Sequence, residues 1–172
     1  MFTKILIANR GEIAVRVIKT CQRLHIRTVA IFTKPDAKAL HVRMADERVL
    51  LVKGEAKGYL EADEIIRICK SLNVDAVHPG YGFLSENALF CRALEKSGIA
   101  FIGPTPESIE QFGLKHIARE LAIKSKVRVV PGSSLLHSVE DAIEWAEEIG
   151  YPVLLKATAG GGGIGMYECN SA

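Results

Sequence analysis

The stretch Lys4-Ile5-Leu6-Ile7-Ala8 is a short apolar run that ends in the turn-forming residues Asn9-Arg10-Gly11. Apolar residues then recur at helical spacing, at Ile13, Val17, Ile18, Cys21 and Leu24. The next run, RTVAIF at 27–32, is rich in β-branched residues and predicts a second strand. A strand, a helix and a strand in this order predict a βαβ unit, which decides the fold class.

The same alternation continues to about residue 105. It predicts strands at 49–52, 74–78 and 99–102 and helices at 61–72 and 88–94. This pattern is typical of an α/β fold with a Rossmann-like parallel sheet and right-handed crossovers. Ligands of such sheets gather beyond the carboxyl ends of the strands. The loops expected at those ends are 8–12, 79–87 and 104–106.

The pattern changes after Thr105, which we expect to cap a helix with Pro106 in its first position. Helical character then extends over 108–124, with a break near Gly113. Ser138 is followed by a further predicted helix at 139–149.

A last strand, predicted at 153–156, leads into a glycine-rich turn. Met166–Cys169 begins a second strand that we expect to pair back on the first. Little sequence follows, so we expect this second unit to be cut off and the chain to be a fragment.

Composition excludes several classes of function. The 172 residues include 22 Lys and Arg and 20 Asp and Glu, a formal net charge of +2, which argues against a dedicated nucleic-acid binder. No apolar run approaches the roughly 20 residues of a membrane span. The start of the chain does not have the pattern of a signal peptide, so we expect a cytoplasmic protein. No cysteines show zinc spacing, and three of them lie in apolar helical patterns typical of buried thiols: Cys21, Cys69 and Cys91.

The glycine-rich turn is the strongest residue-level indication of a ligand. Five glycines occupy six positions: Gly160, Gly161, Gly162, Gly163 and Gly165. Glycine backbone can approach a ligand closely, and successive N–H groups can surround phosphate oxygens. Lys156, at the end of the preceding strand, can place an ammonium over the same phosphates. The spacing matches neither G-x-G-x-x-G nor a P-loop, which favours a hairpin flap over a nucleotide; a loop without a ligand is the alternative.

A basic segment surrounds Lys115, His116 and Arg119. A charge run of this kind is usually a solvated helix face. A lone histidine is more often a surface or hydrogen-bonded residue than a catalytic base, so His116 alone predicts no chemistry.

Four motifs together resemble the biotin carboxylase domain of biotin-dependent carboxylases, in order and across the whole chain. They are ILIANRGEIA at 5–14, HPGYGFLSEN at 78–87, FIGP at 101–104 and KATAGGGGIGM at 156–166. The resemblance implies a pre-ATP-grasp domain at 1–113 and the beginning of an ATP-grasp domain at 114–172. It also implies the reaction, in which MgATP and bicarbonate form carboxyphosphate and biotin on a carrier domain is carboxylated.

The resemblance further implies roles for single residues. Lys115 and Lys156 match ATP-contacting lysines, the five glycines match the flap over the phosphates, and Met166 matches a residue of the nucleotide pocket. Loop 79–87 matches one that faces the biotin side, through Tyr81 and Glu86 and with Phe83 and Asn87 beside them. The structural alternative is that Glu86 and Asn87 only begin a helix capped by Ser85. The Asn9–Glu12 turn is expected to be structural and interdomain.

Two departures are similar to urea carboxylase. Ile164 stands where many biotin carboxylases have Arg or Lys, and residues 112–116 read FGLKH where Gly-Asp-Lys is usual. Arg23 falls where an acidic residue is common in one family dimer interface, so that dimer is in doubt and a homo-oligomer stays open.

The resemblance places the Mg²⁺ ligands, the bicarbonate-binding residues and the general base after residue 172. We therefore expect these 172 residues alone to be inactive. Two other readings stay open: a pre-ATP-grasp module that binds a partner without catalysis, and a dehydrogenase domain, which the missing G-x-G-x-x-G disfavours.

Overall fold

The computed structural model describes residues 1–53, 56–158 and 164–172. The chain forms two compact units, Met1–Ile109 and Glu110–Ala172, each described here by itself. The boundary expected from the sequence, between residues 113 and 114, stays a prediction. The division after Ile109 lies within helix α5 (Pro106–Gly113), and the expected boundary lies at the end of the same helix.

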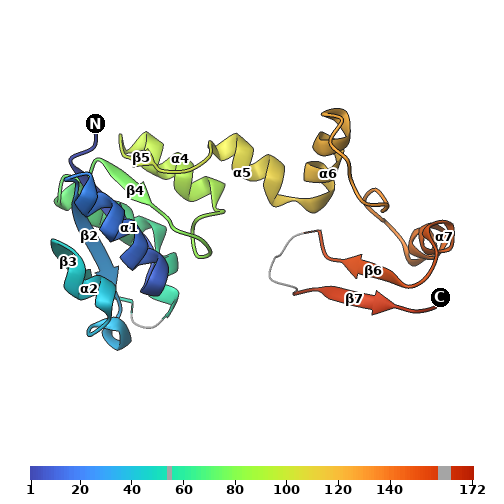
Figure 1. Ribbon diagram of the computed structural model, residues 1–172, viewed down its shortest axis with the longest axis horizontal. Coiled ribbons are helices and arrows are strands. Elements are labelled where there is room, and N and C mark those ends of the chain that lie inside the picture. Colours follow the sequence, from blue (N-terminus) through green and yellow to red (C-terminus); the bar gives the residue numbers. More distant parts are fainter. Residues whose placement is uncertain (54–55, 159–163) are drawn as a thin grey trace. The chain divides into compact units, whose positions relative to one another are not determined.

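The first unit is built on a five-stranded parallel sheet in the order β3-β2-β1-β4-β5 (Figure 1). Its strands are β1 (Lys4–Ile7), β2 (Arg27–Phe32), β3 (Glu47–Leu50), β4 (Ala76–His78) and β5 (Ala100–Phe101). The central strand β1 pairs on both sides, with Ile5 opposite Thr28 of β2 and opposite Ala76 of β4. The predicted α/β fold with a parallel sheet is confirmed.

Helices cover both faces of this sheet. They are α1 (Gly11–Arg23), α2 (Leu40–Met44), α3 (Ala62–Ser71) and α4 (Ala88–Lys96), with short 3-10 helices at Lys34–Asp36 and Ala56–Leu60. Alternate residues of β1 enter different cores: Leu6 packs with residues of α3 and α4, and Ile7 packs with residues of α1. A strand buried on both faces is apolar throughout, which is why the KILIA run reads as continuous rather than alternating.

One predicted strand is displaced. β3 covers Glu47–Leu50, whereas the apolar run predicted 49–52. Its first residues are polar because β3 is an edge strand, and Glu47 forms ion pairs with Lys4 (2.9 Å) and Arg27 (2.6 Å). The apolar pattern alone could not show this start, which depends on charges from the neighbouring strands.

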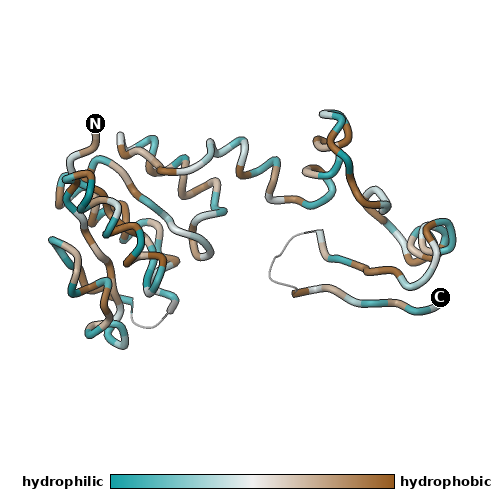
Figure 2. Tube along the Cα trace, in the orientation of Figure 1, coloured by the Kyte–Doolittle hydropathy of each residue, from teal (hydrophilic) through white to brown (hydrophobic). Residues whose placement is uncertain are grey.

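The second unit contains α6 (Lys115–Lys124), α7 (Val139–Ile149) and an antiparallel pair of strands, β6 (Val153–Lys156) and β7 (Met166–Cys169). The predicted bounds of α7 and of both strands are confirmed, as is the break near Gly113. Among the described residues of this unit, Ala146 is the only buried hydrophobic residue. Figure 2 shows the hydrophobic stretch of β6, where Leu154 and Leu155 are exposed.

The helix starts follow the predicted caps. Thr105 Oγ1 accepts a hydrogen bond from Ser108 N (3.2 Å) at the start of α5, and Ser138 Oγ accepts from Asp141 N (3.0 Å) at the start of α7. Within the described parts of the chain, we find no helix with the length and apolar character that crossing a bilayer requires.

Candidate functional site

The loop that follows β4 is tied to the end of β1 through Asn9. This side chain is 3% exposed, and its Nδ2 donates to the carbonyl oxygens of Pro79 and Tyr81, both at 2.8 Å. Its Oδ1 accepts from Arg10 N at 2.9 Å. Parallel strands β1 and β4 are neighbours, so the two loops that leave their carboxyl ends meet here, as the sequence predicted.

His78, the last residue of β4, also contacts this loop through its side chain. Gly80 N donates to His78 Nδ1 at 3.0 Å, which requires that this nitrogen carry no proton. Burial lowers the pKa of His78, and the positive charge of Arg16 lowers it further. The histidine is therefore neutral at pH 7 and acts as a hydrogen-bond acceptor.

Three residues of the loop have positive φ: Gly80 (67°), Gly82 (65°) and Phe83 (45°). At Gly80 a Cβ would lie 2.7 Å from Asn9 Nδ2, so glycine is required there for space as well as for conformation. Phe83 is the strained residue of the three, because a bulky side chain rarely adopts this region. Its ring stacks on Tyr59, with centroids 5.1 Å apart and planes at 23°.

Tyr59 connects the loop to a buried carboxylate. Tyr59 Oη donates to Asp36 Oδ2 at 2.8 Å, and Arg10 donates to both oxygens of Asp36, with Nε at 2.7 Å. Arg10 holds the pKa of Asp36 below its ordinary value, while burial and the neighbouring carboxylate raise that of Tyr59. The side chains of Asn9 and Arg10 thus have structural contacts within the first unit, and the interdomain role expected for the Asn9–Glu12 turn stays a prediction.

The structure places the two candidate biotin-side residues on the outside of this loop. Tyr81 is 60% exposed, and its hydroxyl donates to Glu12 Oε2 at 3.3 Å. Glu86 is also exposed and lies in the turn before α4. Both side chains are accessible to a ligand, and their role in binding stays a prediction.

The structural alternative, in which this stretch begins a helix capped by Ser85, is right that Asn87 begins the helix and wrong about the cap. Asn87 is the cap: its Oδ1 accepts from Phe90 N at 2.9 Å, and α4 begins at Ala88. Ser85, two residues before Asn87, lies in the preceding turn, where its N donates to Gly82 O at 2.9 Å. The sequence contains two good capping residues, and the turn at 82–85 decides between them by delaying the helix.

In the second unit, three candidate nucleotide residues lie around the turn end of the β6–β7 hairpin, where the segment 157–165 connects the two strands. Lys156 and Met166 are directly opposite each other, and both are exposed. Lys115, the first residue of α6, donates its backbone N–H to Thr158 O at 3.2 Å, just after β6. The fold of this unit therefore brings residues 41 positions apart in sequence to one place.

Gly165 is required by the same geometry. Its φ is 70°, and a Cβ would lie 2.9 Å from Ala157 Cβ, while its carbonyl accepts from Ala157 N at 2.8 Å. Gly160, Gly161, Gly162 and Gly163 lie outside the described residues, so their place in the phosphate flap stays a prediction.

The basic segment of α6 was expected to be a solvated helix face, but two of its side chains, Arg119 and His116, are partly enclosed by the protein. Arg119 donates to Val130 O (2.7 Å) and Gly132 O (3.0 Å), so it organises the loop after α6. His116 is half-buried, and its Nδ1 has no hydrogen-bond partner within the described part of the chain. The sequence pattern does not predict the two Arg119 contacts, because they depend on the path of the chain after the helix.

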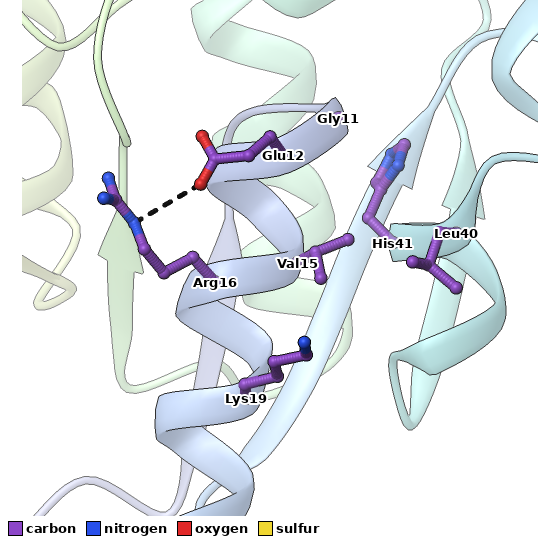
Figure 3. Close-up of a pocket in the computed structure, with 7 residues that line it drawn as sticks. All are labelled: Gly11, Glu12, Val15, Arg16, Lys19, Leu40 and His41. Atoms are coloured by element: carbon purple, nitrogen blue, oxygen red, sulfur yellow. Dashed lines mark ion pairs between the residues drawn. The ribbon is translucent and has the colours of Figure 1, made fainter.

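Two further features of the described residues were compared with the candidate residues, a possible metal cluster and a surface hollow. No three His, Cys, Asp or Glu side chains among them gather as a metal site would require. A surface hollow of about 540 Å³ lies between α1 and α2, where Val15 and Lys19 extend toward α2 and Glu12 pairs with Arg16 on the other side (Figure 3). None of the candidate ATP or biotin residues lines it.

Comparison with known proteins identifies the class. Residues 1–109 match the family described as "Biotin carboxylase, N-terminal domain", and residues 115–172 match "Carbamoyl-phosphate synthase L chain, ATP binding domain". The chain belongs to the biotin carboxylase N-terminal domain family. The resemblance stated from the four motifs is confirmed.

Individual relatives agree with this assignment. The chain is 56% identical to a biotin carboxylase of Halalkalibacterium halodurans over 168 residues (96% of this chain, 37% of the relative). It is 51% identical to a urea amidolyase of Lachancea kluyveri over 171 residues (99% and 9%). A solved dimer of the biotin carboxylase domain of Hydrogenobacter thermophilus 2-oxoglutarate carboxylase, in complex with MgADP, ADP and bicarbonate, has a TM-score of 0.96 at 48% identity (99% and 38%). The chain thus spans well under half the length of these relatives.

Proposed function

We propose that these residues form the amino-terminal part of a biotin carboxylase of the urea carboxylase type. Such an enzyme is an ATP-dependent ligase that uses MgATP and bicarbonate to carboxylate biotin on a carrier domain. Family membership supports the class. The subclass is supported by Ile164 and by FGLKH at 112–116, and a urea amidolyase is among the relatives. A cytoplasmic, reducing compartment is part of the proposal and agrees with four free cysteines. A homo-oligomer is also part of it, because the Hydrogenobacter relative is a dimer.

The observation that carries the proposal is the position of Lys156 and Met166 at the turn end of the β6–β7 hairpin, with the backbone of Lys115 bonded to Thr158 beside them. Two ammonium groups there can neutralise phosphate oxygens of ATP, and a compact point charge suits that task. Met166 can contact the apolar part of the nucleotide. We assign the five glycines to the turn that covers the phosphates and excludes water, which would protect a hydrolysable carboxyphosphate.

Mg²⁺ supplies charge neutralisation of the phosphates when it is bound. The described residues contain no group suited to hold it, so we assign none of its ligands to them. Tyr81 and Glu86 are proposed to face biotin from the first unit, where both are exposed. Their loop leaves the carboxyl end of β4, the edge at which parallel sheets bind ligands.

A chimaera tests this function. The corresponding segment of the H. halodurans biotin carboxylase is replaced by residues 1–172, and ADP release is measured with and without bicarbonate and biotin. We expect activity that depends on both. Lys115→Ala and Lys156→Ala should each raise the KM for ATP roughly 10- to 100-fold, the effect of losing a hydrogen bond to a charged group.

Lys124→Ala is the matched control, since Lys124 is an exposed lysine at the far end of α6. It should leave the KM for ATP within about twofold, as surface substitutions usually do. A folded chimaera without activity contradicts the carboxylase function and favours a binding module. Equal effects of all three lysine substitutions contradict the proposed nucleotide residues.

A further inference from the structure

The loop from Pro79 to Asn87 is held in a strained shape by contacts from outside it. Positive φ at Phe83 is costly for a bulky residue and persists only where neighbours enforce it. The stack of Phe83 on Tyr59 fixes the middle of the loop. Asn87, as the cap of α4, fixes its end. At the beginning of the loop, Gly80 N donates to His78 Nδ1 and the Tyr81 hydroxyl donates to Glu12 Oε2, and the backbone carbonyls of residues 79 and 81 are held by one further contact.

That contact is the Asn9 carboxamide. Its two N–H groups are both used, one on Pro79 O and one on Tyr81 O, each at 2.8 Å. Gly80 lies between these carbonyls and directly against the amide, with no room for a Cβ. Asn9 thus holds the Tyr81 backbone through its carbonyl, while the Tyr81 side chain is 60% exposed and its hydroxyl donates to Glu12 Oε2 at 3.3 Å.

We propose that Asn9 is a positioning residue for biotin binding: its amide fixes the loop backbone and so the direction in which Tyr81 is presented. This proposal rests on the proposed function for the identity of the ligand, but the mechanical role of Asn9 does not. Only a buried group with two donors and one acceptor satisfies all three backbone partners, and asparagine supplies these at this length. An aspartate of the same shape has no donor and would face two carbonyl oxygens with negative charge.

Hydrogen exchange in the 172-residue chain tests the mechanical role. Asn9→Asp is compared with Asn73→Asp, the same chemical change at an exposed turn after α3. We expect Asn9→Asp to speed exchange of the Gly80 and Ser85 amides about tenfold or more, from two lost hydrogen bonds. Amides of β2 should keep their wild-type rates in both variants. Equal acceleration of loop and β2 amides would show only a general loss of stability and would overturn the proposal.

Gly80→Ala is a second variant, which disturbs the Asn9 contact by a change in the loop itself. Its Cβ would displace the Asn9 amide, and alanine disfavours the positive φ. We expect the same two amides to exchange faster while Asn9 itself is unchanged. If Gly80→Ala leaves loop exchange at the wild-type rate, the Asn9 contact does not fix the loop.

Kinetics of the chimaera then test the link to biotin. Asn9→Asp and Gly80→Ala should raise the KM for biotin roughly tenfold while the KM for ATP stays within about twofold, and Asn73→Asp should change neither. An inactive parent chimaera contradicts the proposed function, and the exchange result still stands for the loop. An active chimaera in which the loop loosens without change in the KM for biotin contradicts the positioning role alone.

Discussion

At the scale of single residues, Asp36 is a buried carboxylate that joins side chains from separate segments of the chain. It accepts hydrogen bonds from Arg10 and Tyr59, and it is 7% exposed. Both donors come from other segments of the chain, so a loss at Asp36 leaves partners unpaired in each of them. The network joins the turn after β1 to the ring that supports Phe83.

We expect Asp36→Asn to destabilise the first unit by about 2 kcal/mol, because one strong acceptor and its charge are lost beside a partly buried guanidinium. Urea unfolding followed by circular dichroism measures this. Asp63→Asn, on the first turn of α3, is a control with the same change at an exposed position, and it should cost less than about 0.5 kcal/mol. Equal losses in the two variants would contradict the role of the network.

Two histidines, the buried His41 and the half-buried His78, predict a pH dependence of stability. Burial lowers the pKa of both His41 and His78 below the ordinary 6.5. The unfolded chain therefore binds protons near pH 6.5 that the folded chain does not, so stability is complete above this value and is lost as pH falls through the lower folded pKa values. The free energy of unfolding should decrease between pH 7.5 and pH 5.5, in urea titrations at the two pH values.

His41→Leu provides the matched variant. Both ring nitrogens of His41 are buried without a hydrogen-bond partner among the described residues, although the Ile31 backbone lies near. Leucine therefore removes the titrating group without removing a hydrogen bond, and the fall in stability with pH should become shallower. Asp36, Asp46 and Asp75, whose pKa values are lowered from 3.8, lose their contribution only at lower pH, outside this window. An unchanged slope would show that His41 does not contribute.

At the scale of helices and strands, α4 is preceded by two residues that could cap it, Ser85 and Asn87, and only Asn87 does so. Asn87→Ala should destabilise the first unit by about 1 kcal/mol through loss of the bond to Phe90 N, whereas Ser85→Ala should cost less. Thermal unfolding of the two variants measures the difference. The reverse order would mean that Ser85 is the effective cap, as its sequence position suggested.

Elements with local signals could be predicted from the sequence. Ser138 at the start of α7, Pro106 at the start of α5 and Gly113 at the end of α5 act on residues within one turn, and the sequence pattern indicates all three. The start of β3 could not, since Glu47 is placed by charges on β1 and β2.

The candidate site divides in the same way. The position of Lys156 opposite Met166 follows from a hairpin, which sequence spacing predicts. The hold of Asn9 on Tyr81 joins positions 72 apart and has no local signature. The only sequence feature that pointed to Asn9 was a polar residue just after a buried apolar run, and in the structure that residue makes a structural contact.

At the scale of the whole chain, the two units differ in how much apolar surface they bury. The first has cores on both faces of its sheet, while the described part of the second buries Ala146 alone among hydrophobic residues. Local opening is easiest where few apolar contacts are lost. We expect limited proteolysis of the 172-residue chain to cut within 110–172 first and to leave a stable product of about 1–109, identified by mass spectrometry. Early cuts inside β1 or β2 would contradict this.

The same difference bears on activity. We expect residues 1–172 by themselves to show no bicarbonate-dependent hydrolysis of ATP, because the candidate nucleotide residues are on the unit with the less developed core. Phosphate release from the purified chain, with the chimaera as positive control, measures this. Turnover by the isolated chain comparable to that of the chimaera would show that these residues are sufficient.

The close approach of Gly80 to the Asn9 amide has a consequence for how such sequences change over time. Neither position can vary alone: a side chain at 80 collides with the amide, and a shorter residue at 9 leaves two carbonyls without donors. Across descendants of one ancestor, the two positions should therefore be inherited as a pair. Any lineage that has replaced one of them should carry a compensating replacement at the other.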